Sequence, residues 1–232
     1  MCSASNCFSR RSQPCSNSKR KLLALREGRG PSHGMLCSLL PLTTIPAASY
    51  NSAIAIMRRV LLLTGQPGVG KTALIKEALA STQAKSDGFC TEEIRIDRVR
   101  QGFRIRTLDG QEAILAHVDI SSPYQVSRYR VDTEALDRVA VSALHRALKE
   151  ADLIVIDEIG KMELLSSQFR EAVMQAINSG KRVLGTIMLN PHPFADEIRR
   201  HPEVETLLIT RDNRTEVMKR ISNWLAEGPD CG

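Results

Sequence analysis

Short, continuous apolar runs alternate with helix-like segments along most of this chain. Residues 58–64 (RRVLLLT) and 152–157 (DLIVID) contain two such runs, and a run of this kind is typical of a strand buried on both faces. Residues 132–150 instead repeat apolar side chains three and four positions apart, which is the period of a helix with one buried face. We expect Asp132 or Thr133 to cap that helix.

The same patterns predict the remaining elements. Further strands are predicted at 89–96, 102–108, 112–118, 182–188 and 204–210, and further helices at 73–81, 167–180, 194–201 and 212–227. Because strands and helices alternate after residue 130, we expect an α/β fold with a mostly parallel sheet flanked by helices. The strands between residues 89 and 118, separated by turn signals, predict a small inserted antiparallel hairpin or meander.

The first 56 residues differ from the rest in composition. They are rich in serine and contain seven lysine and arginine residues but one acid, Glu27, which accounts for the whole net charge of +6. This composition is typical of an organelle transit peptide, and equally of a disordered basic tail or of an upstream start codon placed before Met57. We therefore expect a basic extension at 1–56 and a nucleotide-binding domain at 57–232. The location is chloroplast or mitochondrion if the extension is a targeting segment, and cytoplasm otherwise.

Charge, hydropathy and cysteine content narrow the classes of partner and the type of compartment that we expect. The body from residue 57 is neutral and aromatic residues make up 4% of the chain, so we expect no nucleic-acid partner. No apolar run is long enough to predict a membrane span. The cysteines show no Cys-x-x-Cys spacing and are concentrated before residue 38, which favours a reducing compartment over a disulfide scaffold.

Residues 65–72 (GQPGVGKT) carry the most specific motif. The spacing Gly-x-x-x-x-Gly-Lys-Thr, between a predicted strand and a predicted helix, indicates a phosphate-binding P-loop. In such a loop the backbone N–H groups surround phosphate oxygens, the lysine reaches the β- and γ-phosphates, and the threonine hydroxyl binds Mg²⁺. We expect nucleotide contacts along the whole loop, with a catalytic role for Lys71 and a metal-binding role for Thr72. The loop residues are Gly65, Gln66, Pro67, Gly68, Val69, Gly70, Lys71 and Thr72.

Two adjacent acids follow the apolar run at 152–157. Burying a carboxylate is costly unless a positive charge pairs with it, and a Mg²⁺ ion beside the P-loop would supply that charge. We therefore predict that Asp157 helps to hold Mg²⁺. Glu158, one residue further where the chain leaves the strand, is predicted to orient or deprotonate a water molecule as the catalytic base.

Several segments together resemble one family. TGQPGVGKT, GFCTEEIR, YRVD, VIDEIGKMEL, GTI, HPFADEI and TRDNR occur in the order seen in the small P-loop enzymes of the cancer-related nucleoside-triphosphatase family. The resemblance covers residues 58–225, and its most specific element is IDEIGKMEL.

This resemblance implies a RecA-like sheet and hydrolysis of ATP, GTP and other nucleoside triphosphates. It also implies a second set of nucleotide contacts, namely Leu153, Ile154, Val155, Ile156, Asp157, Glu158, Ile159 and Gly160.

Two further side chains are weaker candidates. Lys161 could reach the γ-phosphate or pair with Glu163, and Arg214 could neutralise transition-state charge or be an exposed helix-start arginine. A small-molecule kinase and a slow nucleotide-dependent switch remain the alternatives to a hydrolase. The sequence leaves the oligomeric state open, with a monomer favoured.

Overall fold

A computed structural model describes residues 58–227 of the 232-residue chain, and the predictions for residues 1–56 lie outside this range. One nine-stranded sheet in the order β5-β6-β4-β3-β2-β7-β8-β1-β9 organises the described residues. Its strands are β1 Val60–Thr64, β2 Ser86–Ile96, β3 Val99–Thr107, β4 Glu112–His117, β5 Gln125–Val126, β6 Tyr129–Val131, β7 Leu153–Ile159, β8 Arg182–Ile187 and β9 Val204–Leu208.

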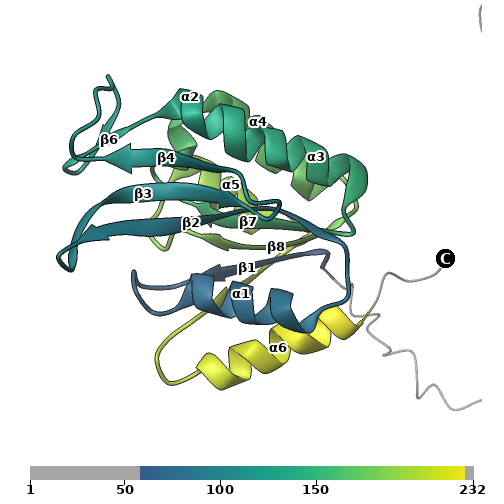
Figure 1. Ribbon diagram of the computed structural model, residues 1–232. Coiled ribbons are helices and arrows are strands. Elements are labelled where there is room, and N and C mark those ends of the chain that lie inside the picture. The colour runs from purple at the N-terminus through teal and green to yellow at the C-terminus, as the bar shows by residue number, and fades with distance from the viewer. Residues whose placement is uncertain (1–57, 228–232) are drawn as a thin grey trace, which may run out of the picture. The chain divides into compact units, whose positions relative to one another are not determined.

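Helices cover both faces of this sheet. Figure 1 shows α1 and α6 on one side and α2, α3 and α4 on the other. The helical segments are α1 Lys71–Ser81, α2 Thr133–Leu136, η1 Asp137–Val141, α3 Ser142–Glu150, η2 Glu163–Leu165, α4 Ser167–Asn178, α5 Pro193–Arg200 and α6 Arg214–Ala226. The predicted α/β fold is therefore confirmed. None of the helices within residues 58–227 is long and apolar enough to cross a membrane.

Alternate side chains of the central strands enter two separate cores. In β1, Val60 and Leu62 belong to the core beneath α2–α5, while Leu61 and Leu63 belong to the core beneath α1 and α6. All four side chains are fully buried. This arrangement explains the continuous apolar run, because a strand covered on both faces has no polar face. Trp224 of α6 is buried in the second core.

Five parallel strands form one side of the sheet, in the order β2-β7-β8-β1-β9, and end at the edge strand β9. The predicted antiparallel strands are present, but they extend this sheet instead of standing apart from it. The 11-residue β2 makes the connection, because its residues 86–90 pair in parallel with β7 and its residues 89–96 pair antiparallel with β3. The hairpin from β2 and β3 therefore overhangs the end of β7.

The helix predicted at 132–150 is present with an internal irregularity. The Asp132 side chain accepts a hydrogen bond from the N–H of Ala135 at 2.8 Å, which confirms the predicted cap. One π-helical turn, η1, then separates α2 from α3. The apolar face continues through this turn, with Val139, Ala140 and Leu144 buried.

Candidate nucleotide-binding and active site

The predicted P-loop connects the end of β1 to the start of α1. Gly68 and Gly70 have φ angles of 76° and 101°, in the left-handed region that glycine adopts readily. Gly70 is the N-cap of α1 and has no side chain to accept bonds from the first N–H groups of the helix. Those donors and the helix dipole together favour an anion at this position.

Lys71, the first residue of α1, is held inside the loop. Its ammonium group donates a hydrogen bond to the carbonyl oxygen of Gly65 at 3.1 Å, and the residue is 9% exposed. The P-loop therefore curves around a nearly buried cation, as phosphate binding requires.

Asp157 lies at the carboxyl end of the sheet and is 1% exposed. Its Oδ1 accepts a hydrogen bond from the hydroxyl of Thr186 at 2.6 Å, whereas Oδ2 is buried with no hydrogen-bond partner within the described residues. Burial raises the pKa of Asp157, while the hydrogen bond from Thr186, the nearby hydroxyl of Thr72 and the charge of Lys71 oppose that rise. One oxygen of this carboxyl is thus left for a ligand that the protein does not supply.

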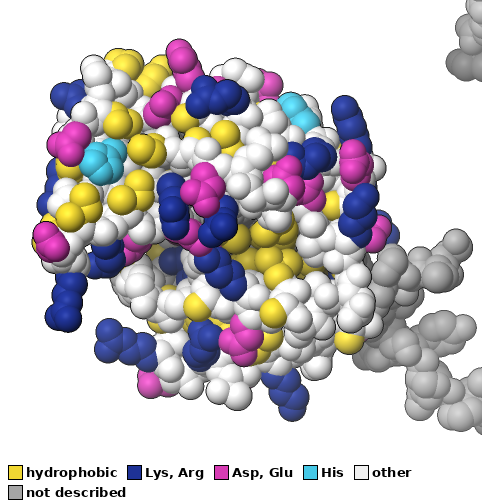
Figure 2. All heavy atoms as spheres, viewed as in Figure 1, with side chains coloured by type: hydrophobic (Ala, Val, Ile, Leu, Met, Phe, Trp, Pro, Cys, Tyr) yellow, Lys and Arg dark blue, Asp and Glu magenta, His cyan; other side chains and the backbone are white. Residues whose placement is uncertain are grey.

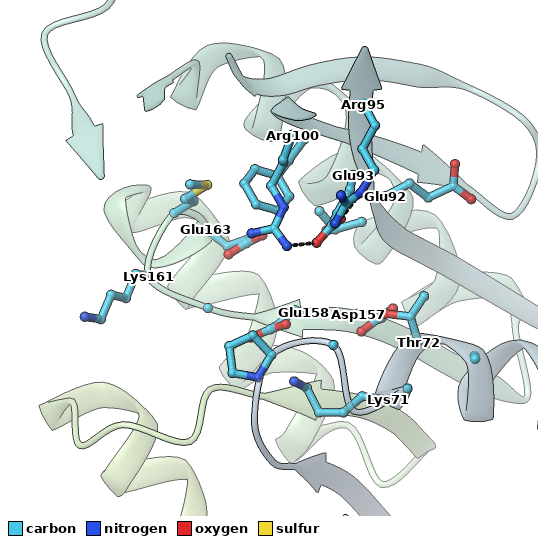
Figure 3. A pocket seen from close by; sticks show the side chains of 18 of the residues that line it. Lys71, Thr72, Glu92, Glu93, Arg95, Arg100, Asp157, Glu158, Lys161 and Glu163 are labelled. Atoms are coloured by element: carbon cyan, nitrogen blue, oxygen red, sulfur yellow. Dashed lines mark hydrogen bonds and ion pairs between the residues drawn. The ribbon is translucent and has the colours of Figure 1, made fainter. Parts of the chain in front are cut away.

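Glu158 lines the same cleft and lies beside Lys71 and Asp157 (Figure 3). The strand β7 continues to Ile159, so the prediction that the chain leaves the strand before Glu158 is wrong. The pKa of Glu158 is raised, mainly because the carboxyl is buried. The positive charge of Lys71 lowers this pKa, and the negative charge of Asp157 raises it further. A carboxyl whose pKa is raised in this way is better suited to accept a proton near neutral pH.

These groups face a cleft of about 810 Å³, which we call the phosphate cleft after the ligand that the P-loop predicts. The P-loop and the end of β7 form one wall, and the β2–β3 hairpin forms the other. Thr72 and Asp157 supply a hydroxyl and a carboxylate oxygen, which are hard oxygen ligands of the kind that Mg²⁺ prefers. The residues present therefore fit Mg²⁺, which Thr72 and Asp157 would hold.

The predicted contacts at Leu153–Gly160 divide into two groups. Asp157, Glu158 and Gly160 line the cleft. Leu153, Ile154, Val155, Ile156 and Ile159 are at most 1% exposed and belong to the two cores. These five side chains position the strand and do not line the cleft.

The two weaker candidates occupy different places. Lys161 lines the cleft but extends away from Lys71 (Figure 3). Arg214, at the start of α6, donates to Glu77 at 2.7 Å and lies 3.5 Å from the carbonyl oxygen of Gly70. Arg214 is therefore beside the P-loop and already paired with an acid of α1.

Several residues of the cleft did not emerge from sequence reasoning as site residues. Thr186, the second-last residue of β8, donates to Asp157, but a threonine near the end of a strand carries no distinctive signal. Glu163 is 4% exposed and lines the cleft from η2, although its place in the GKMEL segment suggested only a pairing with Lys161. Arg95 and Arg100 also line the cleft from the hairpin, because β2 continues past the sheet centre.

The strand, P-loop and helix, with an acid-bearing strand two positions away in the sheet, define a P-loop nucleoside-triphosphatase fold. The model of the family described as NTPase matches residues 60–222, and the chain belongs to that family. Two relatives named nucleoside-triphosphatase THEP1 illustrate the similarity. The protein of Thermotoga sp. (strain RQ2) is 47% identical over 165 residues, covering 71% of this chain and 94% of the relative. That of Methanocaldococcus jannaschii is 42% identical over 172 residues, covering 72% and 98%.

Two solved structures share this fold. The crystal structure of THEP1 from Aquifex aeolicus matches with a TM-score of 0.67 and 37% identity, covering 72% of this chain and 98% of that one. The solution structure of a human cancer-related nucleoside triphosphatase matches with a TM-score of 0.61 and 37% identity, covering 72% and 96%. The family resemblance inferred from the motifs is thereby confirmed.

Proposed function

We propose that this chain hydrolyses ATP, GTP and other nucleoside triphosphates to the diphosphate and phosphate in a Mg²⁺-dependent reaction. The observation that carries the proposal is the meeting of Lys71, Asp157 and Glu158 in one cleft beside the P-loop. Family membership supports it, because relatives across 71% of the chain are named nucleoside-triphosphatases.

The P-loop backbone and Lys71 hold the β- and γ-phosphates, while Thr72 and the free oxygen of Asp157 would bind Mg²⁺. When bound, Mg²⁺ supplies positive charge to the phosphate oxygens. Glu158 accepts a proton from a water molecule as the water oxygen attacks the γ-phosphorus. The bond from that phosphorus to the bridging oxygen breaks, and the diphosphate keeps the electron pair.

The ion pairs of the β2–β3 hairpin favour water over a second substrate as the acceptor of the γ-phosphoryl group. Glu93 forms ion pairs with Arg95 and Arg100, and Glu92 forms ion pairs with Lys76 and Arg104. Two of these arginines line the cleft, but their partners fix them on a paired hairpin of the sheet. A kinase instead needs a lid whose arginines close over the phosphates and exclude water.

The test measures phosphate release by the full chain from ATP, GTP, CTP and UTP, with Mg²⁺ or with EDTA. Glu158→Gln should retain nucleotide binding and lower kcat by about 10²-fold, because the amide cannot accept the proton. Glu171→Gln is the matched control, since Glu171 is an exposed residue of α4 remote from the cleft.

Two results would contradict the proposal. Phosphate release that persists unchanged in EDTA would remove the Mg²⁺ requirement. A Glu158→Gln variant as active as Glu171→Gln would show that Glu158 is not the base.

A further inference from the structure

Glu163 is a buried carboxyl of the phosphate cleft that has no part in the proposed reaction as described so far. It is the first residue of η2 and is 4% exposed. Its side chain lines the cleft together with those of Asp157 and Glu158 (Figure 3). Because burying a carboxyl is costly, its presence at this place calls for a physical reason.

A tight turn after β7 brings Glu163 back toward the proposed base. The N–H of Leu164 donates to the carbonyl oxygen of Gly160 at 3.0 Å, and the N–H of Ser166 donates to the carbonyl oxygen of Glu163 at 3.2 Å. These backbone bonds hold η2 against the end of β7. The Glu163 carboxyl is thereby held beside Gly160, which itself follows closely after Glu158.

The absence of a side chain at Gly160 leaves a space that two carboxyl groups share. A Cβ atom at this position would lie 2.8 Å from Oε2 of Glu163 and 3.4 Å from Oε1 of Glu158. Because both distances start from the same point, the two oxygens border the same small space. A hydrogen bond between the two carboxyls, direct or through one water molecule, is therefore within reach.

Two ionised carboxyls would repel each other in this space. Among the described residues, the charges that act on the Glu163 carboxyl are those of Glu158 and Asp157, and both are negative. Arg100 lines the same cleft but forms its ion pair with Glu93. Burial and the charge of Glu158 raise the pKa of Glu163 to about 8. Glu163 therefore keeps its proton near neutral pH and can act as a hydrogen-bond donor.

We propose that Glu163 is a positioning residue, whose neutral carboxyl donates a hydrogen bond to the Glu158 carboxylate and so directs the other oxygen of Glu158 toward the attacking water. Glu163 keeps its own proton throughout, and the proton of the water still passes to Glu158 alone. Holding the base in place raises kcat, whereas binding of the phosphates depends on the P-loop. The inference rests on the proposed function, since it concerns the base of the proposed hydrolysis.

Steady-state phosphate release and ADP binding by the full chain test this role. Glu163→Gln keeps a neutral donor of the same length, so its kcat should stay within about threefold of wild type. Glu163→Leu has no donor, so its kcat should fall by roughly tenfold, while the dissociation constant of ADP changes by less than about twofold. Exposed Glu171→Gln is the matched control, and thermal unfolding verifies that each variant is folded.

Gly160→Ala tests the same contact without removing either carboxyl. The added methyl would occupy the shared space and displace the Glu163 oxygen at 2.8 Å, whereas 3.4 Å from Glu158 Oε1 is an ordinary contact. Alone, this change should lower kcat by roughly tenfold. In the Glu163→Leu background it should lower kcat by less than about threefold further, because the hydrogen bond is already absent.

The inference is overturned if Glu163→Leu keeps the kcat of wild type, or if Glu163→Gln loses as much as Glu163→Leu. Losses from Gly160→Ala and Glu163→Leu that multiply in the double variant would also overturn it, because independent packing defects combine in that way. Each of these results leaves the proposed hydrolysis standing. A wild type that releases no phosphate overturns the proposed hydrolysis, and this role with it.

Discussion

At the scale of single residues, the site concentrates three carboxyl groups where water has little access. Asp157, Glu158 and Glu163 all line the phosphate cleft. Burial, reinforced by the charge of Glu158, raises the pKa of Glu163 to about 8. Gly160 lets this carboxyl lie close to the backbone, since a Cβ atom there would be 2.8 Å from Glu163 Oε2. The protein thus places a protonated acid next to the proposed base.

This protonated acid makes stability depend on pH. Because burial raises the pKa of Glu163 from 4.5 to about 8, its contribution is complete below pH 4.5 and is lost as pH rises through about 8. Glu163→Gln cannot ionise, so between pH 5 and pH 9 its Tm should fall less than that of wild type, by about 2 °C or more. Thermal unfolding in EDTA checks this prediction, with exposed Glu171→Gln as the control. An equal fall in wild type and Glu163→Gln would contradict it.

At the scale of elements, β2 joins the five parallel strands of the sheet to its antiparallel strands. Gly88 pairs with Val155 of β7, has a φ of 135°, and would place a Cβ atom 2.0 Å from the carbonyl oxygen of Val155. A side chain at this position would push β2 away from β7. The hairpin that overhangs the phosphate cleft therefore depends on one close contact between backbones.

Gly88→Ala should lower the free energy of unfolding by about 3 kcal/mol or more, because both the φ angle and the contact with Val155 oppose a Cβ atom. Gly110→Ala separates these two causes, since Gly110 has a φ of 94° but no atom within 4 Å of the added Cβ. Its cost should be limited to backbone strain, about 1–2 kcal/mol. Urea unfolding measures both values, and equal losses would show that the close contact at Gly88 has no energetic effect.

At the scale of the whole molecule, the described site is contained within one α/β unit. Its residues run from Gly65 to Arg214, inside the range 60–222 that the family model matches. On the described face, basic and acidic side chains are interspersed (Figure 2), in keeping with the neutral charge of the body.

We therefore expect that a chain beginning at Met57 folds and hydrolyses nucleoside triphosphates with kcat and KM within about twofold of the full chain, as expected for a domain with its own core. Steady-state phosphate release by the two chains provides the comparison. A tenfold or larger loss in the shorter chain would assign residues 1–56 a part in catalysis.

The features that depend on short-range patterns could be predicted from the sequence alone. The motif at Gly65–Thr72 is local, because glycine conformation, a helix start and one lysine are sufficient to build a phosphate site. The paired acids Asp157 and Glu158 followed from the cost of ending a buried strand in charge. Continuous apolar runs and helical periods also predicted most element types, since burial on one or two faces sets those patterns directly.

Which distant segments of the chain come into contact could be seen only in the folded structure. The placement of β8 between β1 and β7 brings Thr186 to Asp157, and Ile209, which follows β9, lies against Gly65. The pairing of β2 with β3 likewise brings Arg95 and Arg100 to the wall of the cleft that faces the P-loop. Strand order depends on pairings between residues far apart in the chain, and no local period encodes which strands become neighbours.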